Sequence, residues 1–152
     1  MIDKLSKLFK HKATKEQKRI EIQKTGGYIS NSMCYEAIEL IPIILIDNAI
    51  KYSERRSTIT LALSHTNSVT KVTVTSYGRP VPDEEIPRLF KRFFRGSNSL
   101  ESSSTGLGIG LWVVRKILEA HNSSIEYNYE NKLREFATNK FVFTLTANGL
   151  TR

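Results

Sequence analysis

Three glycines at alternate positions lead directly into a helical pattern in the stretch Ser104-Thr105-Gly106-Leu107-Gly108-Ile109-Gly110-Leu111-Trp112-Val113-Val114-Arg115-Lys116-Ile117-Leu118. Glycine at this density lowers the stability of an ordinary helix or strand. It therefore indicates a turn where the backbone closely approaches a ligand or another part of the chain. Exposed N–H groups at a helix start, with the positive end of the helix dipole behind them, form a site for an anion. The stretch therefore predicts a phosphate-binding loop, of the kind that holds a nucleotide. A tightly packed turn that binds no ligand is the alternative.

The composition is that of one globular domain. The chain has 152 residues, of which 39% are hydrophobic, and this is enough to bury a core. The single cysteine, Cys34, excludes an intrachain disulfide and a zinc cluster and fits a reducing compartment. No apolar run reaches about 18 residues, and the start lacks the long apolar segment of a secretory signal. We therefore expect a cytoplasmic location and no membrane segment in this chain.

The net charge of +8 raises the possibility of a nucleic-acid partner. The basic residues are dispersed, however, because mixed-sign faces separate two groups of them. One group lies in the first nineteen residues and the other comprises Arg88, Lys91, Arg92 and Arg95. This distribution indicates solvated faces or a linker, so no DNA partner is expected.

The chain divides into three parts by pattern. Residues 1–18 predict a short basic amphipathic helix or linker, with Leu5, Leu8 and Phe9 at helical spacing. Residues 19–146 predict the folded domain, and residues 147–152 a frayed tail. Within the domain, alternating apolar residues predict strands at 20–23, 28–30, 58–63, 71–75, 125–129 and 141–145.

Helical spacing predicts three helices in the folded domain, over residues 35–52, over residues 87–94 and from the glycine stretch to about His121. Pro42 interrupts the first. Either the main helix begins near Ile41, with the proline in its first turn, or a longer helix is kinked there, and the periodicity of residues 36–40 favours the kink. The third helix is expected to bury a face that carries Val113, Ile117 and Ala120, and Asn122 to take the left-handed closing position.

Two polar segments are predicted to be loops. Residues 76–82 follow a strand and contain two prolines, and residues 96–104 are small, polar and rich in serine, which indicates a mobile functional loop. The elements together predict an α+β fold, a two-layer sandwich of a mixed, largely antiparallel sheet with helices on one face. Since the glycines follow a polar loop and not a strand, the order does not fit a dinucleotide-binding fingerprint.

A polar cluster is predicted on the apolar helix of residues 35–52. Asn48, Lys51 and Tyr52 fall on one face by their spacing. An asparagine in such an apolar helix needs a partner for its amide, which is supplied either by the core or by a ligand. The neighbouring lysine and tyrosine favour a polar site at least as much as a structural role.

Four segments in this order resemble the motifs of the Bergerat-fold (GHKL) ATPases, which include gyrase, the large heat-shock chaperones and sensor histidine kinases. The resemblance runs from about residue 19 to 146 and is greatest to the catalytic, ATP-binding domain of histidine kinases. The motifs are the N box at residues 47–53 (DNAIKYS), the G1 box at 76–81 (SYGRPV), the F box at 89–96 (LFKRFFRG) and the G2 box at 105–111 (TGLGIGL).

The resemblance implies a role for each matching residue. Asn48 would offer its amide oxygen to Mg²⁺, and Lys51 would meet phosphate as a point charge, so these two would be the catalytic residues. Tyr52 would pack beside the nucleotide, and Ser76 and Gly78 would lie at its base. Residues 97–104 would form a lid over ATP. The remaining positions would anchor that lid or bind phosphate: Phe90, Arg92, Arg95, Thr105, Gly106, Leu107, Gly108, Ile109 and Gly110.

Three positions depart from the family pattern. Ser76 stands where the G1 aspartate normally accepts a hydrogen bond from the adenine amino group, and a serine hydroxyl is shorter and uncharged. Ile44 stands where the family has another asparagine or the glutamate that activates water in the hydrolytic members. Pro80 replaces the second glycine of G1. These departures argue against ATP hydrolysis of the gyrase or chaperone type and indicate a divergent kinase domain.

The resemblance implies phosphotransfer from ATP with Mg²⁺, mainly by positioning and charge neutralisation. A histidine kinase needs a phosphoacceptor histidine on a helical hairpin, and none of His11, His65 and His121 has that setting. The acceptor is therefore expected on a longer parent chain or a separate protein, with a response regulator as an indirect partner. The alternatives are an anti-sigma-type serine kinase, a degenerate nucleotide-binding interaction module and a basic domain without a ligand.

Overall fold

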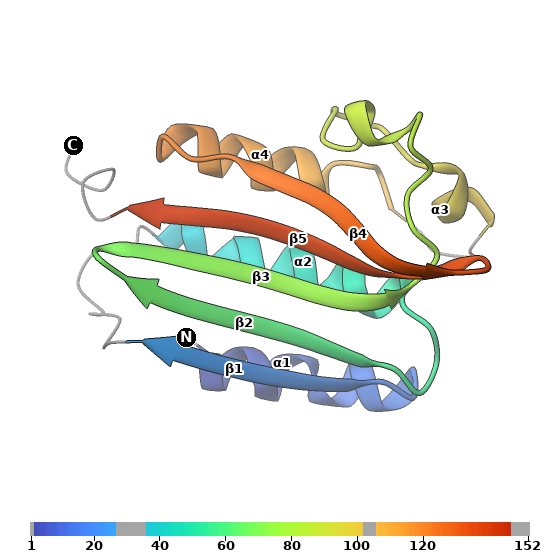
Figure 1. Ribbon diagram of the computed structural model, residues 1–152, viewed down its shortest axis with the longest axis horizontal. Helices are drawn as coiled ribbons and strands as arrows, with labels where there is room; N and C mark the ends of the chain where they lie inside the picture. Colours follow the sequence, from blue (N-terminus) through green and yellow to red (C-terminus); the bar gives the residue numbers. More distant parts are fainter. Residues whose placement is uncertain (1, 27–35, 102–105, 147–152) are drawn as a thin grey trace.

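A five-stranded sheet forms one layer of the computed structural model, which describes residues 2–26, 36–101 and 106–146 (Figure 1). The strand order is β1-β2-β3-β5-β4, and only the β1–β2 pair is parallel. The strands are β1 (Arg19–Gly26), β2 (Thr58–Thr66), β3 (Val69–Gly78), β4 (Ile125–Leu133) and β5 (Phe136–Thr146).

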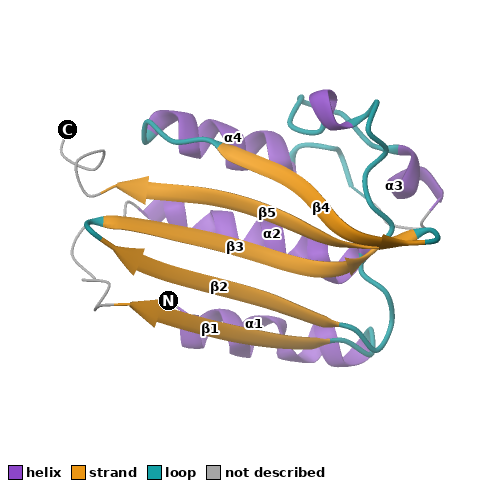
Figure 2. Cartoon of the chain, in the orientation of Figure 1, coloured by secondary structure: helices purple, strands orange, loops and turns teal. Residues whose placement is uncertain are grey.

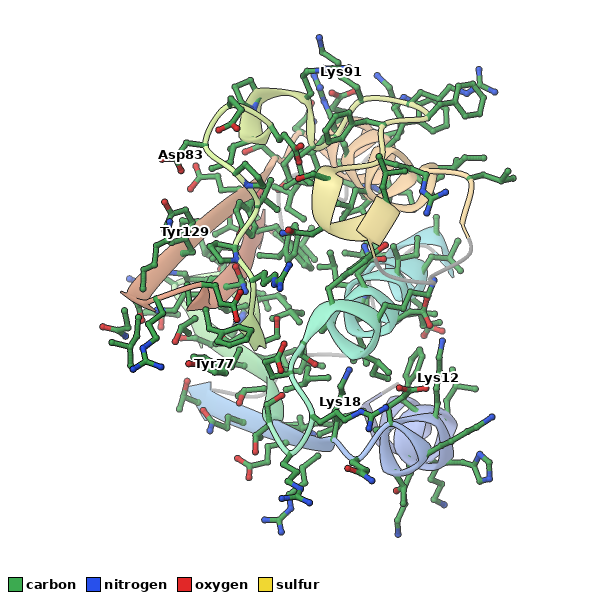
Figure 3. All side chains as sticks on the ribbon, turned by 90° about the vertical axis from the view of Figure 1, so that its right-hand side faces the viewer. Lys12, Lys18, Tyr77, Asp83, Lys91 and Tyr129 are labelled. Carbon is green, nitrogen blue, oxygen red and sulfur yellow. The ribbon has the colours of Figure 1, made fainter. Side chains whose placement is uncertain are left out.

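The helices lie together on one face of this sheet (Figures 2 and 3). They are α1 (Ile2–Lys15), the short 3₁₀ helix η2 (Glu36–Glu39), α2 (Leu40–Tyr52), the 3₁₀ turn η3 (Ile86–Arg88), α3 (Ser97–Glu101) and α4 (Gly110–Ala120). The α+β two-layer sandwich predicted from the sequence is confirmed.

Alternation along the strands builds the core. Ile59, Leu61 and Leu63 of β2 are buried, and so are Val72 and Val74 of β3, because side chains two residues apart point to the same face. The helices complete this core with fully buried side chains from two segments: Ile41, Leu45, Ile46 and Ile50 of α2, with Val114 and Leu118 of α4.

A hairpin joins β2 to β3, and its two turn residues, Asn67 and Ser68, both have positive φ angles, of 50° and 63°. Such φ values match the right-handed twist of the flanking strands. Asn122 also has a positive φ, of 53°, after α4, as the sequence predicts.

The prediction of a kinked helix around Pro42 is wrong. The α helix begins at Leu40, after the 3₁₀ turn η2, so Pro42 lies in its first turn. The N–H groups of a first turn have no partner within the helix, so a residue without an N–H costs no hydrogen bond there.

Three other predictions need correction. Ser76 and Gly78 belong to β3, not to a loop, because they pair with Asn139 and Ala137 of β5. Residues 87–94 form the end of η3 and the turns that follow it, and no α helix. The face of α4 that packs on the core carries Val114 and Leu118, while Ala120 is exposed. The strand predicted at residues 28–30 and the tail at 147–152 lie outside the described residues.

Helix α1 packs on the domain. Phe9 and Ala13 are 6% and 3% exposed and belong to the main core, whereas Leu8 is 60% exposed. Figure 1 shows α1 behind β1 and β2. None of the helices in the described residues is long and apolar enough to cross a membrane.

Candidate functional site: a cavity at one end of the sheet

A cavity of about 490 Å³ lies where α2 ends, α4 begins and β3 meets β5, at the right-hand end of Figure 1. Figure 3 faces this end of the molecule, with the sheet on one side and the helices on the other. The predicted site residues that line it are Asn48, Lys51, Tyr52, Ser76, Arg95, Gly106, Leu107, Gly108, Ile109 and Gly110. Ten sequence-predicted residues, spread over more than sixty positions, are thus brought to one cavity.

The α2 wall carries the polar cluster predicted from helical spacing. Lys51 binds Asp47 one turn earlier, with 2.6 Å between Nζ and Oδ2, and Lys12 of α1 binds the other oxygen of the same carboxylate. Partial burial raises the pKa of the Asp47 carboxyl, but the hydrogen bonds from the two lysines outweigh that effect and hold the pKa below its usual value. Asp47 is therefore an anion that two cations share.

The glycine stretch forms the wall opposite the end of α2. Gly108 has a φ of +68°, and a Cβ there would lie 2.6 Å from the Phe94 carbonyl oxygen, so only glycine fits this close approach. The Phe93 N–H donates to the Gly108 carbonyl at 2.9 Å. Helix α4 begins at Gly110 with no side-chain cap, and residues 106–110 line the cavity, so the first N–H groups of the helix and the positive end of its dipole lie at the cavity. Thr105 lies outside the described residues.

Helix α3, in the segment predicted to be a lid, is tied to the loop that follows β3. Glu85 accepts the Ser97 N–H with both carboxylate oxygens at 3.1 Å, and the Asn98 amide donates to the Pro80 carbonyl at 2.9 Å. Arg95 precedes this helix and donates to the Ser99 carbonyl at 3.1 Å. Arg95, Asn98 and Ser99 all line the cavity, so the described part of this segment closes one of its sides.

The sheet wall is polar but uncharged. Ser76 of β3 pairs with Asn139 of β5, and both line the cavity. The Tyr127 hydroxyl donates to Asn139 Oδ1 at 2.6 Å and accepts the Val81 N–H at 2.8 Å, while the Asn139 amide donates to the Gly78 carbonyl at 3.2 Å. Burial raises the pKa of the Tyr127 hydroxyl to about 12, which keeps it protonated and donating.

Three predicted site residues do not line the cavity. Gly78 faces the backbone after α2, where a Cβ would lie 2.5 Å from the Tyr52 carbonyl oxygen. Phe90 packs edge-on against Phe141, with ring centroids 6.3 Å apart. The Arg92 guanidinium stacks on Phe93 and Trp112, at 4.6 Å and 5.2 Å from the ring centroids. Gly78 and Phe90 thus contact Tyr52 and Phe141, which line the cavity, whereas the two rings beneath Arg92 do not line it.

Sequence reasoning missed Asn139, Tyr127, Arg79 and Asn98, all of which line the cavity. A signal for Asn139 existed, because it shares the strand face of Phe141, Phe143 and Leu145, and a polar residue on a buried strand face needs partners. Arg79 and Asn98 lie within the G1 box and the predicted lid, which the sequence indicates as segments, whereas the position of Tyr127 follows from tertiary packing without a comparable local signal.

The cavity contains few groups that bind metals. No cluster of three or more His, Cys, Asp or Glu side chains that could hold a metal ion occurs among the described residues. Within the lining, the Asn48 amide is a neutral oxygen donor, the Asp47 carboxylate is occupied by two lysines, and the Glu85 carboxylate accepts the Ser97 N–H. This donor set suits a cation that arrives with a polyphosphate and keeps some of its own waters.

The fold is shared with solved kinase structures. The mycobacterial sensor histidine kinase MprB superposes with a TM-score of 0.79 at 20% identity, covering 95% of this chain and 92% of that one. The catalytic domain of the histidine kinase ThkA superposes with a TM-score of 0.73 at 24% identity, covering 95% and 89%. ThkA is also known in complex with the response regulator TrrA. At these identities the likeness establishes the fold alone.

The family described as histidine kinase-, DNA gyrase B-, and HSP90-like ATPases matches residues 35–148, and the chain belongs to this family. ATP is thus the ligand that family membership implies. The chain is 41% identical over 93 residues to the sensor histidine kinase HprS of Escherichia coli K12, covering 60% of this chain and 20% of HprS. It is 30% identical over 125 residues to the sensor protein KdpD of Clostridium acetobutylicum, covering 82% and 13%.

Within the family, the chain corresponds to the ATP-binding catalytic domain of a sensor histidine kinase. It spans a fifth or less of the length of these two relatives.

Proposed function

We propose that this domain binds ATP with Mg²⁺ in the cavity and donates the γ-phosphoryl group to a histidine that lies outside this chain. The observation that carries the proposal is the convergence of Asn48, Lys51, Arg95 and the glycine stretch on one cavity. Two cationic side chains and a helix N-terminus meet there, which is the chemistry that a polyphosphate requires.

In this proposal the phosphates and the base of the nucleotide contact different walls of the cavity. The phosphates lie against residues 106–110 and Lys51, with Arg95 beside them. The base lies against the uncharged sheet wall of Ser76, Asn139 and Tyr127. Such a division supports transfer by positioning, because phosphoryl transfer needs alignment and charge neutralisation more than covalent participation of the protein.

Asn48 would hold Mg²⁺ through its amide oxygen. Bound Mg²⁺ would supply positive charge against the phosphates. This assignment is supported by the position of Asn48 in the cavity wall and by the lack of a carboxylate cluster in the described residues.

Hydrolysis of ATP is not part of the proposal. Ile44, which stands where hydrolytic members carry the water-activating glutamate, lines the cavity and packs against the start of α4, with its Cγ2 3.1 Å from where a Cβ on Gly110 would lie. An alkyl side chain there keeps the wall apolar and cannot accept a proton from water.

The acceptor is assigned to another chain segment or protein. All three histidines lie in the described residues, and none of them lines the cavity. His65 contacts Thr70 in the β2–β3 hairpin at 2.9 Å, and His121 contacts the Ile117 carbonyl at 2.6 Å. A response regulator is the expected receiver of the phosphoryl group, and the complex of ThkA with the response regulator TrrA supports a partner of this class. Dependence on ATP implies a cytoplasmic location.

Calorimetry with a non-hydrolysable ATP analogue tests the binding step. Binding that weakens when EDTA removes Mg²⁺, and that is lost in Asn48→Ala, is the expected result. Folded protein that shows no binding at millimolar analogue would exclude the proposal. Labelled ATP with candidate helical-hairpin acceptors then tests transfer.

Two outcomes of the transfer assay point to other functions. Phosphate that survives acid identifies a serine kinase of the anti-sigma type, since phosphohistidine is acid-labile. Tight nucleotide binding without transfer to any acceptor identifies a nucleotide-binding interaction module, an outcome that the departures at Ser76 and Ile44 favour.

A further inference from the structure

The contact between α1 and the cavity wall lies outside the segment that matches the family. The match begins at residue 35, yet Lys12 of α1 binds Asp47, and Asp47 lines the cavity. The packing of α1 makes this contact a fixed one, because Phe9 and Ala13 are buried in the main core. Lys18, which follows α1, is buried and donates to the Ile50 carbonyl of the same helix α2. Figure 3 shows Lys12 and Lys18 between α1 and α2.

The two oxygens of Asp47 are divided between two lysines. Lys12 binds Oδ1 and Lys51 binds Oδ2. Of the two, Lys51 lines the cavity and Lys12 does not. A lysine ammonium on a flexible stem can exchange one oxygen ligand for another, so Lys51 can leave the carboxylate for a phosphate. That exchange leaves Asp47 beside the phosphates with Lys12 as its remaining partner.

We infer that Lys12 is a positioning residue of the nucleotide site: by holding one oxygen of Asp47, it frees Lys51 to bind phosphate. The inference rests on the proposed binding of ATP in this cavity. Without Lys12, Lys51 would be the sole partner of a partly buried carboxylate, and phosphate would have to compete with Asp47 for it. A carboxylate left with no partner near a polyphosphate would also repel the ligand.

The test compares ATP with adenosine on the full 152-residue chain. Adenosine has no phosphates, so its binding does not require Lys51 to move. Lys12→Met keeps most of the apolar stem and removes the charge. It is expected to weaken Mg²⁺–ATP binding about three- to tenfold at low ionic strength and to leave adenosine binding unchanged.

Three further variants isolate the mechanism. Lys10→Met removes the same charge from an exposed position on the same helix, and it is expected to leave ATP affinity within about twofold. In an Asp47→Asn background, Lys51 is already free, so Lys12→Met is expected to lose most of its effect on ATP. Lys12→Arg, which keeps the charge, is expected to restore the affinity.

The inference is overturned if Lys12→Met lowers the affinities for ATP and adenosine equally, because α1 would then act only through packing. It is also overturned if Lys10→Met matches Lys12→Met, or if the Lys12→Met effect persists undiminished with Asp47→Asn. Absence of ATP binding by the unsubstituted chain would instead overturn the proposed function.

Discussion

Ser76 and Asn139 face each other across the β3–β5 ladder, and both line the cavity. The next pair of core-facing partners on the same ladder, Val74 and Phe141, is apolar. The Ser76–Asn139 pair therefore brings polar groups to the part of the sheet that lines the cavity, where Phe141 adds an apolar surface. Asn139 belongs to a hydrogen-bonded network with Tyr127, and the Ser76–Asn139 pair contains no carboxylate, so the pair offers neutral hydrogen-bonding groups to a ligand.

Ser76→Asp is expected to raise the affinity for ATP. The substitution supplies a charged acceptor for the adenine amino group, and a hydrogen bond to a charged group contributes about 1.5–3 kcal/mol, or about ten- to a hundredfold in affinity. Calorimetry with an ATP analogue measures the gain. Thr75→Asp is the matched control, because its side chain points to the other face of β3.

Unchanged affinity in Ser76→Asp would mean that the base does not lie against Ser76. A large gain without phosphotransfer to any acceptor would instead favour a degenerate binding module. The affinity for adenine nucleotides and the phosphotransfer activity therefore need to be measured on the same variant.

The glycines at positions 106 and 108 are expected to differ sharply in their tolerance of alanine. Gly108 has a φ of +68° and lies against the Phe94 carbonyl, whereas a Cβ on Gly106 would meet no atom within 4 Å. Gly108→Ala should lower the free energy of unfolding by about 1–3 kcal/mol and weaken ATP binding, while Gly106→Ala should change stability by no more than about 0.5 kcal/mol.

Urea unfolding of both glycine variants, each followed by calorimetry, measures this contrast. Equal stability of the two would show that the turn at Gly108 relaxes easily, and the close approach to Phe94 would then have no structural importance.

Tyr127 is expected to make stability depend on pH in the alkaline range. Its pKa is raised to about 12 in the folded chain, above the ordinary value of about 10, so the folded state keeps a proton that the unfolded state has lost. The stabilisation is fully present below about pH 10 and declines as the pH rises toward 12. The stability difference between the unsubstituted chain and Tyr127→Phe should therefore be smaller near pH 11 than near pH 8.

Urea unfolding at the two pH values measures this difference. Tyr77→Phe is the control, because the Tyr77 side chain is 38% exposed and lies outside the network. If the difference in free energy of unfolding between the unsubstituted chain and Tyr127→Phe is the same at both pH values, the hydroxyl is not held protonated by burial.

The elements of this fold were largely predictable because their signals are local. The alternation of Ile59, Leu61 and Leu63 predicts a buried strand face whichever strand is its partner in the sheet. Three glycines before a helical pattern likewise predict where that helix starts. Pro42 was ambiguous by contrast, since a first turn and a kink both accommodate proline, and the packing around the helix decides between them.

The candidate site was predictable in its helix and glycine walls but not in its sheet wall. Arg92 and Arg95 are equivalent by sequence, yet only Arg95 lines the cavity, because Arg92 stacks on Trp112 from a distant helix. The Lys12–Asp47 contact joins residues 35 positions apart. Such relationships depend on tertiary packing, which periodicity does not encode.

The burial of Phe9 predicts that α1 is an integral part of the domain and not a detachable linker. Phe9 is 6% exposed in the main core, while the adjacent Leu8 is 60% exposed. Phe9→Ala should lower the free energy of unfolding by about 3–5 kcal/mol, and Leu8→Ala should change it by no more than about 0.5 kcal/mol. Urea unfolding of the full chain compares this adjacent pair on one helix. Equal, small effects would mean that the folded unit starts near residue 19, and Lys12 would then lack the fixed position from which it contacts Asp47.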